Sequence, residues 1–138
     1  NMEINMEIVL KVKHLNDGNF QTAMAKLANC TAYPTFGTTF AISKLAKKIA
    51  DETMDLNAQY KKNFAEFLDE KGVPVPEKLE NYNLALKDFM DTEITLASEA
   101  GPFKKLKMSG LSKVGLSPAE LVILEPILDT TSAPLEAV

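Results

Sequence analysis

The stretch of residues 38–70 constrains the fold most, because thirty-three residues pass there without a glycine or a proline. Side chains that can face a core return through it every three or four residues: Ile42, Leu45, Ile49, Thr53, Leu56, Tyr60, Phe64 and Phe67. These intervals repeat every eleven residues, about 3.67 residues per turn, and so predict a nearly straight helix. A heptad seam would bring polar residues such as Glu52 and Asn63 into the interface, which disfavours a left-handed coiled coil.

A helix of this length would run roughly 50 Å, whereas a compact domain of this size is about 30 Å wide. Either the helix breaks, or one end projects and takes a partner. Its charges oppose the helix dipole, because lysines such as Lys44 lie in the early turns and acids such as Glu70 lie in the last. We therefore expect packing, rather than local propensity, to stabilise the helix.

The composition is that of one soluble globular domain, with 138 residues of which 46% are hydrophobic and 25% charged. We expect a single domain over residues 1–129 and a loose C-terminal tail over 130–138, which has no periodicity. No apolar run approaches the ~18 residues of a membrane-spanning helix, and the N-terminus lacks the regions of a signal peptide. With Cys30 as the single cysteine, a soluble cytoplasmic protein without a disulfide framework is expected.

All fifteen basic residues are lysines, and the formal net charge is −4. Codon bias in an AT-rich genome is the simplest explanation for the missing arginines. No guanidinium group is available for bidentate recognition of phosphate or guanine. We therefore expect no nucleic-acid partner. No membrane partner is expected either, because the chain has no long apolar run.

The N-terminus begins with Asn-Met-Glu-Ile twice, which indicates a natural start at Met2 or Met6 with Asn1 added. Over residues 2–13 apolar and polar side chains alternate, with Val9 as the one exception. This period of two predicts a β-strand with one buried and one wet face.

Two β-prone segments downstream, residues 92–97 and 104–109, can pair with this strand, and a Gly-Pro turn over 99–102 separates them. A turn at 16–19 precedes a short helix over 20–29.

The long helix follows a loop over residues 31–37, with Thr38 or Thr39 as its N-cap, and Lys71-Gly72 is expected to end it. Pro76 then fits the first position of a second helix. Its apolar face comprises Leu79, Tyr82, Leu86, Phe89 and Met90. The four-residue connection predicts an antiparallel helical hairpin.

The clearest local signal is Leu-Ser-Pro-Ala-Glu-Leu at residues 116–121, where Ser117 and Glu120 form a capping box around Pro118. A short C-terminal helix starts here and is stopped or kinked by Pro126. The elements together predict an α+β fold: a long helix and an antiparallel helical hairpin packed on a small antiparallel sheet of about three strands.

No catalytic or metal-binding motif is present, and no cofactor is expected. His14 and Cys30 could form a base and a nucleophile, but an edge histidine and a half-buried thiol explain them better. The carboxylates near Asp51 lie outside the apolar stripe and are interpreted as a solvated face.

The one basic patch comprises Lys104, Lys105, Lys107 and Lys113, within seventeen residues that contain no acid. A sheet edge protected by lysines is one interpretation, and a site for an anion or an acidic partner is the other. Two loop aromatics, Tyr33 and Phe36, either fill the core or mark an interface if they are exposed.

The chain resembles a family of small uncharacterised proteins encoded by tailed bacteriophages and their prophages. The resemblance covers residues 32–128 and rests on the order of its parts. These are a Pro-containing loop, the Lys-rich helix at 40–49, an acidic helix end, Phe-Met-Asp-Thr-Glu-Ile at 89–94, and the capped helix at 116–121. It implies a setting in the host-cell cytoplasm or the virion, and no site residues.

Two functional hypotheses follow. The first is a non-enzymatic phage protein that binds protein, as a homo-oligomer or with a viral or host partner, motivated by the projecting helix and the Met-rich strand. The second is a protein that sequesters a small anionic, nucleotide-like ligand at the basic patch. An enzyme is third.

Overall fold

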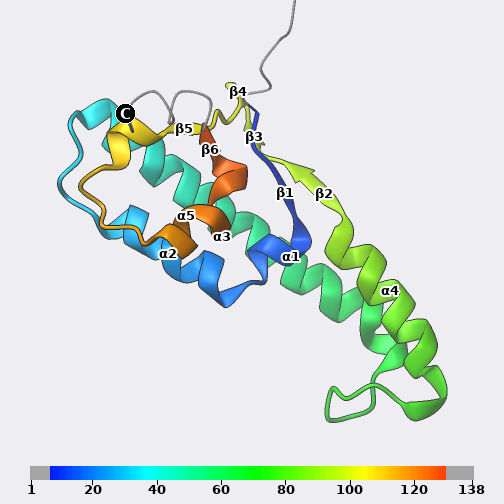
Figure 1. Ribbon diagram of the computed structural model, residues 1–138. Helices are drawn as coiled ribbons and strands as arrows, with labels where there is room; N and C mark the ends of the chain where they lie inside the picture. Colours follow the sequence, from blue (N-terminus) through cyan, green and yellow to red (C-terminus); the bar gives the residue numbers. More distant parts are fainter. Residues whose placement is uncertain (1–6, 130–138) are drawn as a thin grey trace, which may run out of the picture.

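The computed structural model describes residues 7–129, which form an α+β fold as predicted (Figure 1). The helices are α1 Val12–Leu15, α2 Gly18–Asn29, α3 Phe36–Phe64, α4 Leu79–Asp91 and α5 Pro118–Ile123. The 3₁₀ turns are η1 Ala65–Phe67, η2 Pro76–Lys78, η3 Met108–Leu111 and η4 Glu125–Ile127. The strands are β1 Val9–Lys11, β2 Glu93–Thr95, β3 Ala97–Ser98, β4 Gly101–Pro102, β5 Leu106–Lys107 and β6 Leu128–Asp129. The predicted tail and residues 1–6 of the duplicated start lie outside the described residues.

The long helix α3 is unbroken, but it begins and ends earlier than the sequence predicts. Its N-cap is Thr35 instead of Thr38 or Thr39, and the Thr35 hydroxyl accepts a hydrogen bond from the Thr38 N–H at 3.1 Å. The α-helix ends at Phe64, where η1 follows.

A tight turn, rather than further helix, follows η1. The Asp69 carboxylate accepts hydrogen bonds from the N–H groups of Lys71 and Val73 at 2.8 and 3.0 Å. Such bonds offer the backbone a turn in place of a helix. Gly72 has a φ of 80° and closes this turn, so the prediction that it ends the long helix is wrong. The connection to α4 is correspondingly longer than four residues.

The predicted apolar stripe of α3 is confirmed. Its buried members are Ile42, Leu45, Ile49, Leu56 and Phe64, and its half-buried members are Thr53, Tyr60 and Phe67. No break occurs at Thr53, whose hydroxyl donates to the Ile49 carbonyl at 2.8 Å. The helix therefore keeps one face against its neighbours and does not bend away from them.

The second half of α3 and the antiparallel α4 form an arm that extends away from the rest of the fold (Figure 1). Five aromatic rings hold the arm together, with centroids 4.6 to 6.3 Å apart: Tyr60, Phe64, Phe67, Tyr82 and Phe89. No residue of α4 is buried. The predicted helical hairpin is confirmed, and one end of α3 projects.

The N-terminal strand is confirmed as β1, which pairs with β2 in antiparallel fashion and places Leu10 opposite Ile94. The inward-facing residues Ile8, Leu10 and Val12 are fully buried. The strand ends sooner than predicted, because the Nδ1 atom of His14 accepts the Lys11 N–H at 3.0 Å and the chain turns into α1.

The strands form three two-stranded ladders rather than one three-stranded antiparallel sheet. β3 and β4 make a hairpin whose turn is residues 99–100, so the other half of the predicted turn, Gly101 and Pro102, is strand β4. β5 lies within the predicted third strand, but it pairs in parallel with β6, so that Leu106 lies opposite Leu128. Pro126 cannot continue a helix and leaves Leu128 extended, which is why this residue joins a strand and not the C-terminal helix.

The C-terminal helix α5 has the predicted capping box. The Ser117 hydroxyl accepts the Glu120 N–H at 3.2 Å, and the Glu120 carboxylate accepts the Ser117 N–H at 2.9 Å. The same carboxylate pairs with Lys26 of α2 at 2.8 Å. This link closes α5 over the core, whose fully buried large side chains include Phe20, Leu15, Leu27, Leu96, Leu124 and Ile127.

Candidate functional site

A groove of about 770 Å³ lies beside the first turns of α3. One wall is formed by residues 34–45, and the other by residues 103–111. We call it the basic groove. Its volume lies within the ~300–1,000 Å³ that is usual for ligand pockets.

Local structure explains why the two walls meet. Pro34 and the Thr35 cap turn the chain into α3, and the extended segment of β5 passes beside the helix start. Gly110 in η3 lies so near Thr38 that a Cβ built on it would be 3.7 Å from the Thr38 Cγ2 atom. This is an ordinary contact distance, so η3 lies against the first turn of α3 with room for one further carbon atom.

The groove is strongly positive. Four lysines line it: Lys44, Lys104, Lys105 and Lys107. No acidic residue is among its lining residues within 7–129, and the nearest acids along the strand pairing are Glu7, opposite Lys104, and Asp129, opposite Lys107. The positive end of the dipole of the 29-residue helix α3 lies at the same place. An anionic group entering the groove would therefore meet attraction from several sides.

Two phenylalanines give the groove an apolar edge. Phe40 lines it and is 62% exposed, and Phe36 is 82% exposed. Their rings stack along the helix with centroids 6.5 Å apart and an interplanar angle of 26°. Covering such exposed rings with a partner buries apolar surface, which favours binding. Exposed aromatic side chains of this kind are typical of an interface.

The structure brings together only some of the residues that the sequence singles out. Lys104, Lys105 and Lys107 line the groove. Phe36 lies one helical turn from Phe40 at its edge.

Tyr33 and Lys113 lie elsewhere, near the C-terminal end of α2. The Tyr33 hydroxyl donates to the Leu27 carbonyl, and its ring packs against the core. Burial and the neighbouring Cys30 raise the pKa of Tyr33 to about 12. The Cys30 thiol points to the Lys113 carbonyl at 4.0 Å. Tyr33 therefore fills a gap in the fold, and Lys113 is separate from the groove.

Sequence reasoning missed Lys44 and Phe40. Both lie on one face of α3 with Phe36, at intervals of four residues, away from the apolar stripe. That spacing was the available signal. This spacing indicates a binding site only because the fold places the distant segment 103–107 beside the same face of α3.

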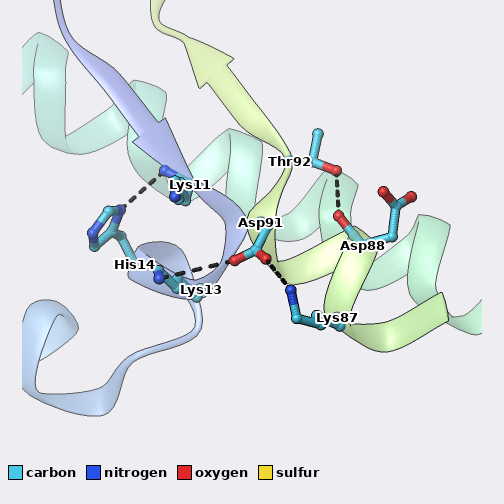
Figure 2. A network of polar contacts seen from close by, with 7 residues as sticks. All are labelled: Lys11, Lys13, His14, Lys87, Asp88, Asp91 and Thr92. Carbon is cyan, nitrogen blue, oxygen red and sulfur yellow. Dashed lines mark hydrogen bonds and ion pairs between the residues drawn. The ribbon is translucent and has the colours of Figure 1, made fainter. Parts of the chain in front are cut away.

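His14 and Cys30 are not brought together, since the twelve-residue helix α2, roughly 18 Å long, lies between them in the chain. Figure 2 shows that His14 accepts the Lys11 N–H, while the neighbouring Asp91 takes Lys13 at 3.9 Å and Lys87 at 3.4 Å. Burial, then Lys13 and Lys11, lower the pKa of His14. These contacts join α1 to α4 and serve the fold.

Within residues 7–129, no three histidine, cysteine, aspartate or glutamate side chains gather in a way that could hold a metal ion. No helix in that part of the chain is long and apolar enough to cross a membrane. Comparisons with protein-family models, curated proteins and solved structures find no match to this chain.

Proposed function

We propose that this chain is a non-enzymatic binding protein that acts through protein–protein interaction, with the basic groove holding an acidic segment of its partner. The observation that carries the proposal is the make-up of the groove: four lysines, no acidic lining residue among residues 7–129, and two exposed phenylalanines at the edge. Ammonium groups attract carboxylates over about 8 Å at physiological ionic strength, and the rings supply apolar contact.

The resemblance to tailed-phage proteins supports a phage setting, in which the partner belongs to the virion or to the host cytoplasm. These two settings make different predictions about particles. A virion component is retained in purified particles at a fixed ratio to the capsid protein, whereas a protein that binds a host factor is left behind in the lysate. Quantitative mass spectrometry of both fractions separates them.

The groove itself is tested with a Glu-rich peptide that carries a single leucine, added to ¹⁵N-labelled protein. We expect shifts of the amide signals of residues 36–45 and 103–111. The matched control peptide, with glutamine in place of every glutamate, should leave the spectrum unchanged.

Charge reversal by Lys104→Glu with Lys107→Glu should abolish the shifts, because both side chains are exposed and line the groove. Lys61→Glu with Lys62→Glu makes the same charge change at the other end of α3 and should leave them intact. Shifts spread evenly over the surface, or equal binding by all variants, would refute the groove as the binding site.

A small anionic, nucleotide-like ligand is the second candidate. It is favoured by the volume of the groove and by the Thr35, Thr38 and Ser109 hydroxyls among its lining residues. A ligand present at 100 times its dissociation constant adds ~2.7 kcal/mol to the free energy of unfolding, which thermal denaturation detects easily. A panel of nucleotides that leaves the melting temperature unchanged removes this candidate.

A further inference from the structure

The two ends of α3 carry opposite kinds of surface. The basic groove lies beside the N-terminal turns of α3. The turn that joins the two arm helices lies at the other end of α3 (Figure 1). We call residues 65–80 the hairpin tip. The 29 residues of α3 separate the two sites by roughly 43 Å, so the tip of one molecule cannot reach its own groove.

The hairpin tip is acidic and has exposed apolar side chains. It carries five carboxylates against two lysines. The carboxylates belong to Glu66, Asp69, Glu70, Glu77 and Glu80. Val73 is 53% exposed and Leu79 is 46% exposed. This combination of negative charge and apolar surface is complementary to the four lysines and two phenylalanines of the groove.

The tip is also held in one shape before any partner binds. Leu68 pairs with Pro74 across the turn, and the Asp69 N–H donates to the Val73 carbonyl at 2.8 Å. Pro74 and Pro76 fix their own φ angles. A segment that is already ordered loses little conformational entropy on docking, so more of the contact energy appears as affinity.

We propose that the partner of the basic groove is a second copy of this chain, whose hairpin tip docks in the groove. The proposal rests on the function proposed above and names its partner. The contact is head-to-tail, because groove and tip are different surfaces on each molecule. Such contacts do not stop at a dimer: they continue until a ring closes, or they propagate as a filament.

Complementary charge reversal tests this directly with the full chain. The groove variant is Lys104→Glu with Lys107→Glu, and the tip variant is Glu66→Lys with Glu70→Lys. All four residues are exposed, so both variants are expected to fold, which circular dichroism verifies. Sedimentation velocity is measured over a concentration series at low ionic strength and again in ~1 M salt, where the screening length falls to about 3 Å.

The unaltered chain should sediment faster as its concentration rises at low ionic strength, and should return to the monomer value in high salt. Each variant alone should remain a monomer: the groove variant has no net positive charge left in its groove, and the tip variant has a net positive charge on both surfaces. A one-to-one mixture should form a dimer and nothing larger, since only one of the two possible contacts is attractive. The control Lys61→Glu with Lys62→Glu, which adds negative charge in the last turn of α3 next to the hairpin tip, should associate at least as tightly as the unaltered chain.

Two outcomes overturn the proposal. One is an unaltered chain that stays monomeric over the whole concentration range; the other is folded variants that associate as the unaltered chain does. If the chain stays monomeric but the acidic peptide still shifts the groove signals, the self-association fails while the proposed function stands. If neither binding is seen, both fail.

Discussion

The phenolic oxygens of Tyr60 and Tyr82 lie 2.7 Å apart, and this hydrogen bond joins the two helices of the arm. Phe64 lies beside both rings, with centroids 4.6 and 5.8 Å away, and is the buried residue of the aromatic cluster. The two helices of the arm therefore pack around the Phe64 ring, and the Tyr60–Tyr82 hydrogen bond joins them beside it. No residue of α4 is buried, so the arm depends on this cluster and on the contacts of α4 with the rest of the fold, such as the Lys13–Asp91 ion pair.

Phe64→Ala should destabilise the arm severely. Replacing a buried phenylalanine by alanine removes apolar burial and leaves a cavity, at a cost of about 3–5 kcal/mol. Tyr82→Phe is the matched variant, since it removes only the hydrogen bond and should cost about 0.5–1.5 kcal/mol. Urea denaturation measures both. A loss below about 1 kcal/mol for Phe64→Ala would mean that the cluster does not support the arm.

Alkaline pH should destabilise the fold in a defined window. The hydrogen bond with Tyr82 and burial raise the pKa of Tyr60 to about 12, and burial with Cys30 raises that of Tyr33 to about 12, from an ordinary value of 10.0. The folded state thus holds these protons more tightly than the unfolded state does. Their contribution is complete below pH 10.0 and is lost as the pH rises toward about 12.

Thermal melting over this pH range, compared with the Tyr33→Phe and Tyr60→Phe variants, measures the effect. Each variant should lose less stability than the unaltered chain between pH 10.0 and about 12, because it has one proton fewer to release. Identical pH profiles for all three proteins would contradict the assignment.

Ser117→Ala should cost about 1 kcal/mol, because it removes the acceptor for the Glu120 N–H at the start of α5. The control is Ser43→Ala, an exposed change inside α3 where alanine is the better helix former, so stability should hold or rise slightly. Chemical denaturation of both variants decides the matter. If both variants change the free energy of unfolding equally, the Ser117 cap does not stabilise α5.

The capped helix at 116–121 and the stripe of α3 were predictable because the signals are local. A capping box and an apolar period both depend on residues within two turns of one another. β1 was predictable for the same reason, through its alternation. The long-range partner β2 followed only because a strand requires one.

The end of α3 and the pairing of β5 were not predictable at this level. The apolar period of a helix does not show that the Asp69 carboxylate accepts two backbone hydrogen bonds and that the chain turns there. The pairing of β5 with β6 depends on the direction that the chain takes after Pro126. The basic groove was half predictable: its lysines on 104–107 form a run, whereas Lys44 joins them only through the fold.

Gly72→Ala should destabilise the hairpin tip, because Gly72 has a φ of 80° and a side chain in this region costs roughly 1–2 kcal/mol. Gly110→Ala is the contrasting variant: its φ is not in the left-handed region, and the nearest atom to an added Cβ lies at 3.7 Å, an ordinary contact. Differential scanning calorimetry should show a lower melting temperature for the first variant only. A larger loss for Gly110→Ala would mean that the wall of the basic groove is tighter than the fit at Thr38 indicates.

Neutralising the groove should stabilise the protein while removing its binding. Lys104, Lys105, Lys107 and Lys44 gather positive charge around one hollow, and the two acids that face Lys104 and Lys107 across the strand pairing, Glu7 and Asp129, offset only part of it. Like charges held close together destabilise the folded state, as they do at many functional sites. Lys104→Gln with Lys107→Gln should therefore raise the free energy of unfolding by a few tenths to about 1 kcal/mol at low ionic strength. The gain should vanish in ~1 M salt, where the repulsion is already screened.

The same double variant should no longer bind the Glu-rich peptide. Urea denaturation at two salt concentrations, run beside the peptide titration, gives both quantities for one protein. A variant that is less stable at low ionic strength would show that these lysines stabilise the fold, because removing a stabilising charge lowers the free energy of unfolding. A variant that is more stable but no longer binds acidic ligands would show that these lysines serve binding and lower the stability of the fold.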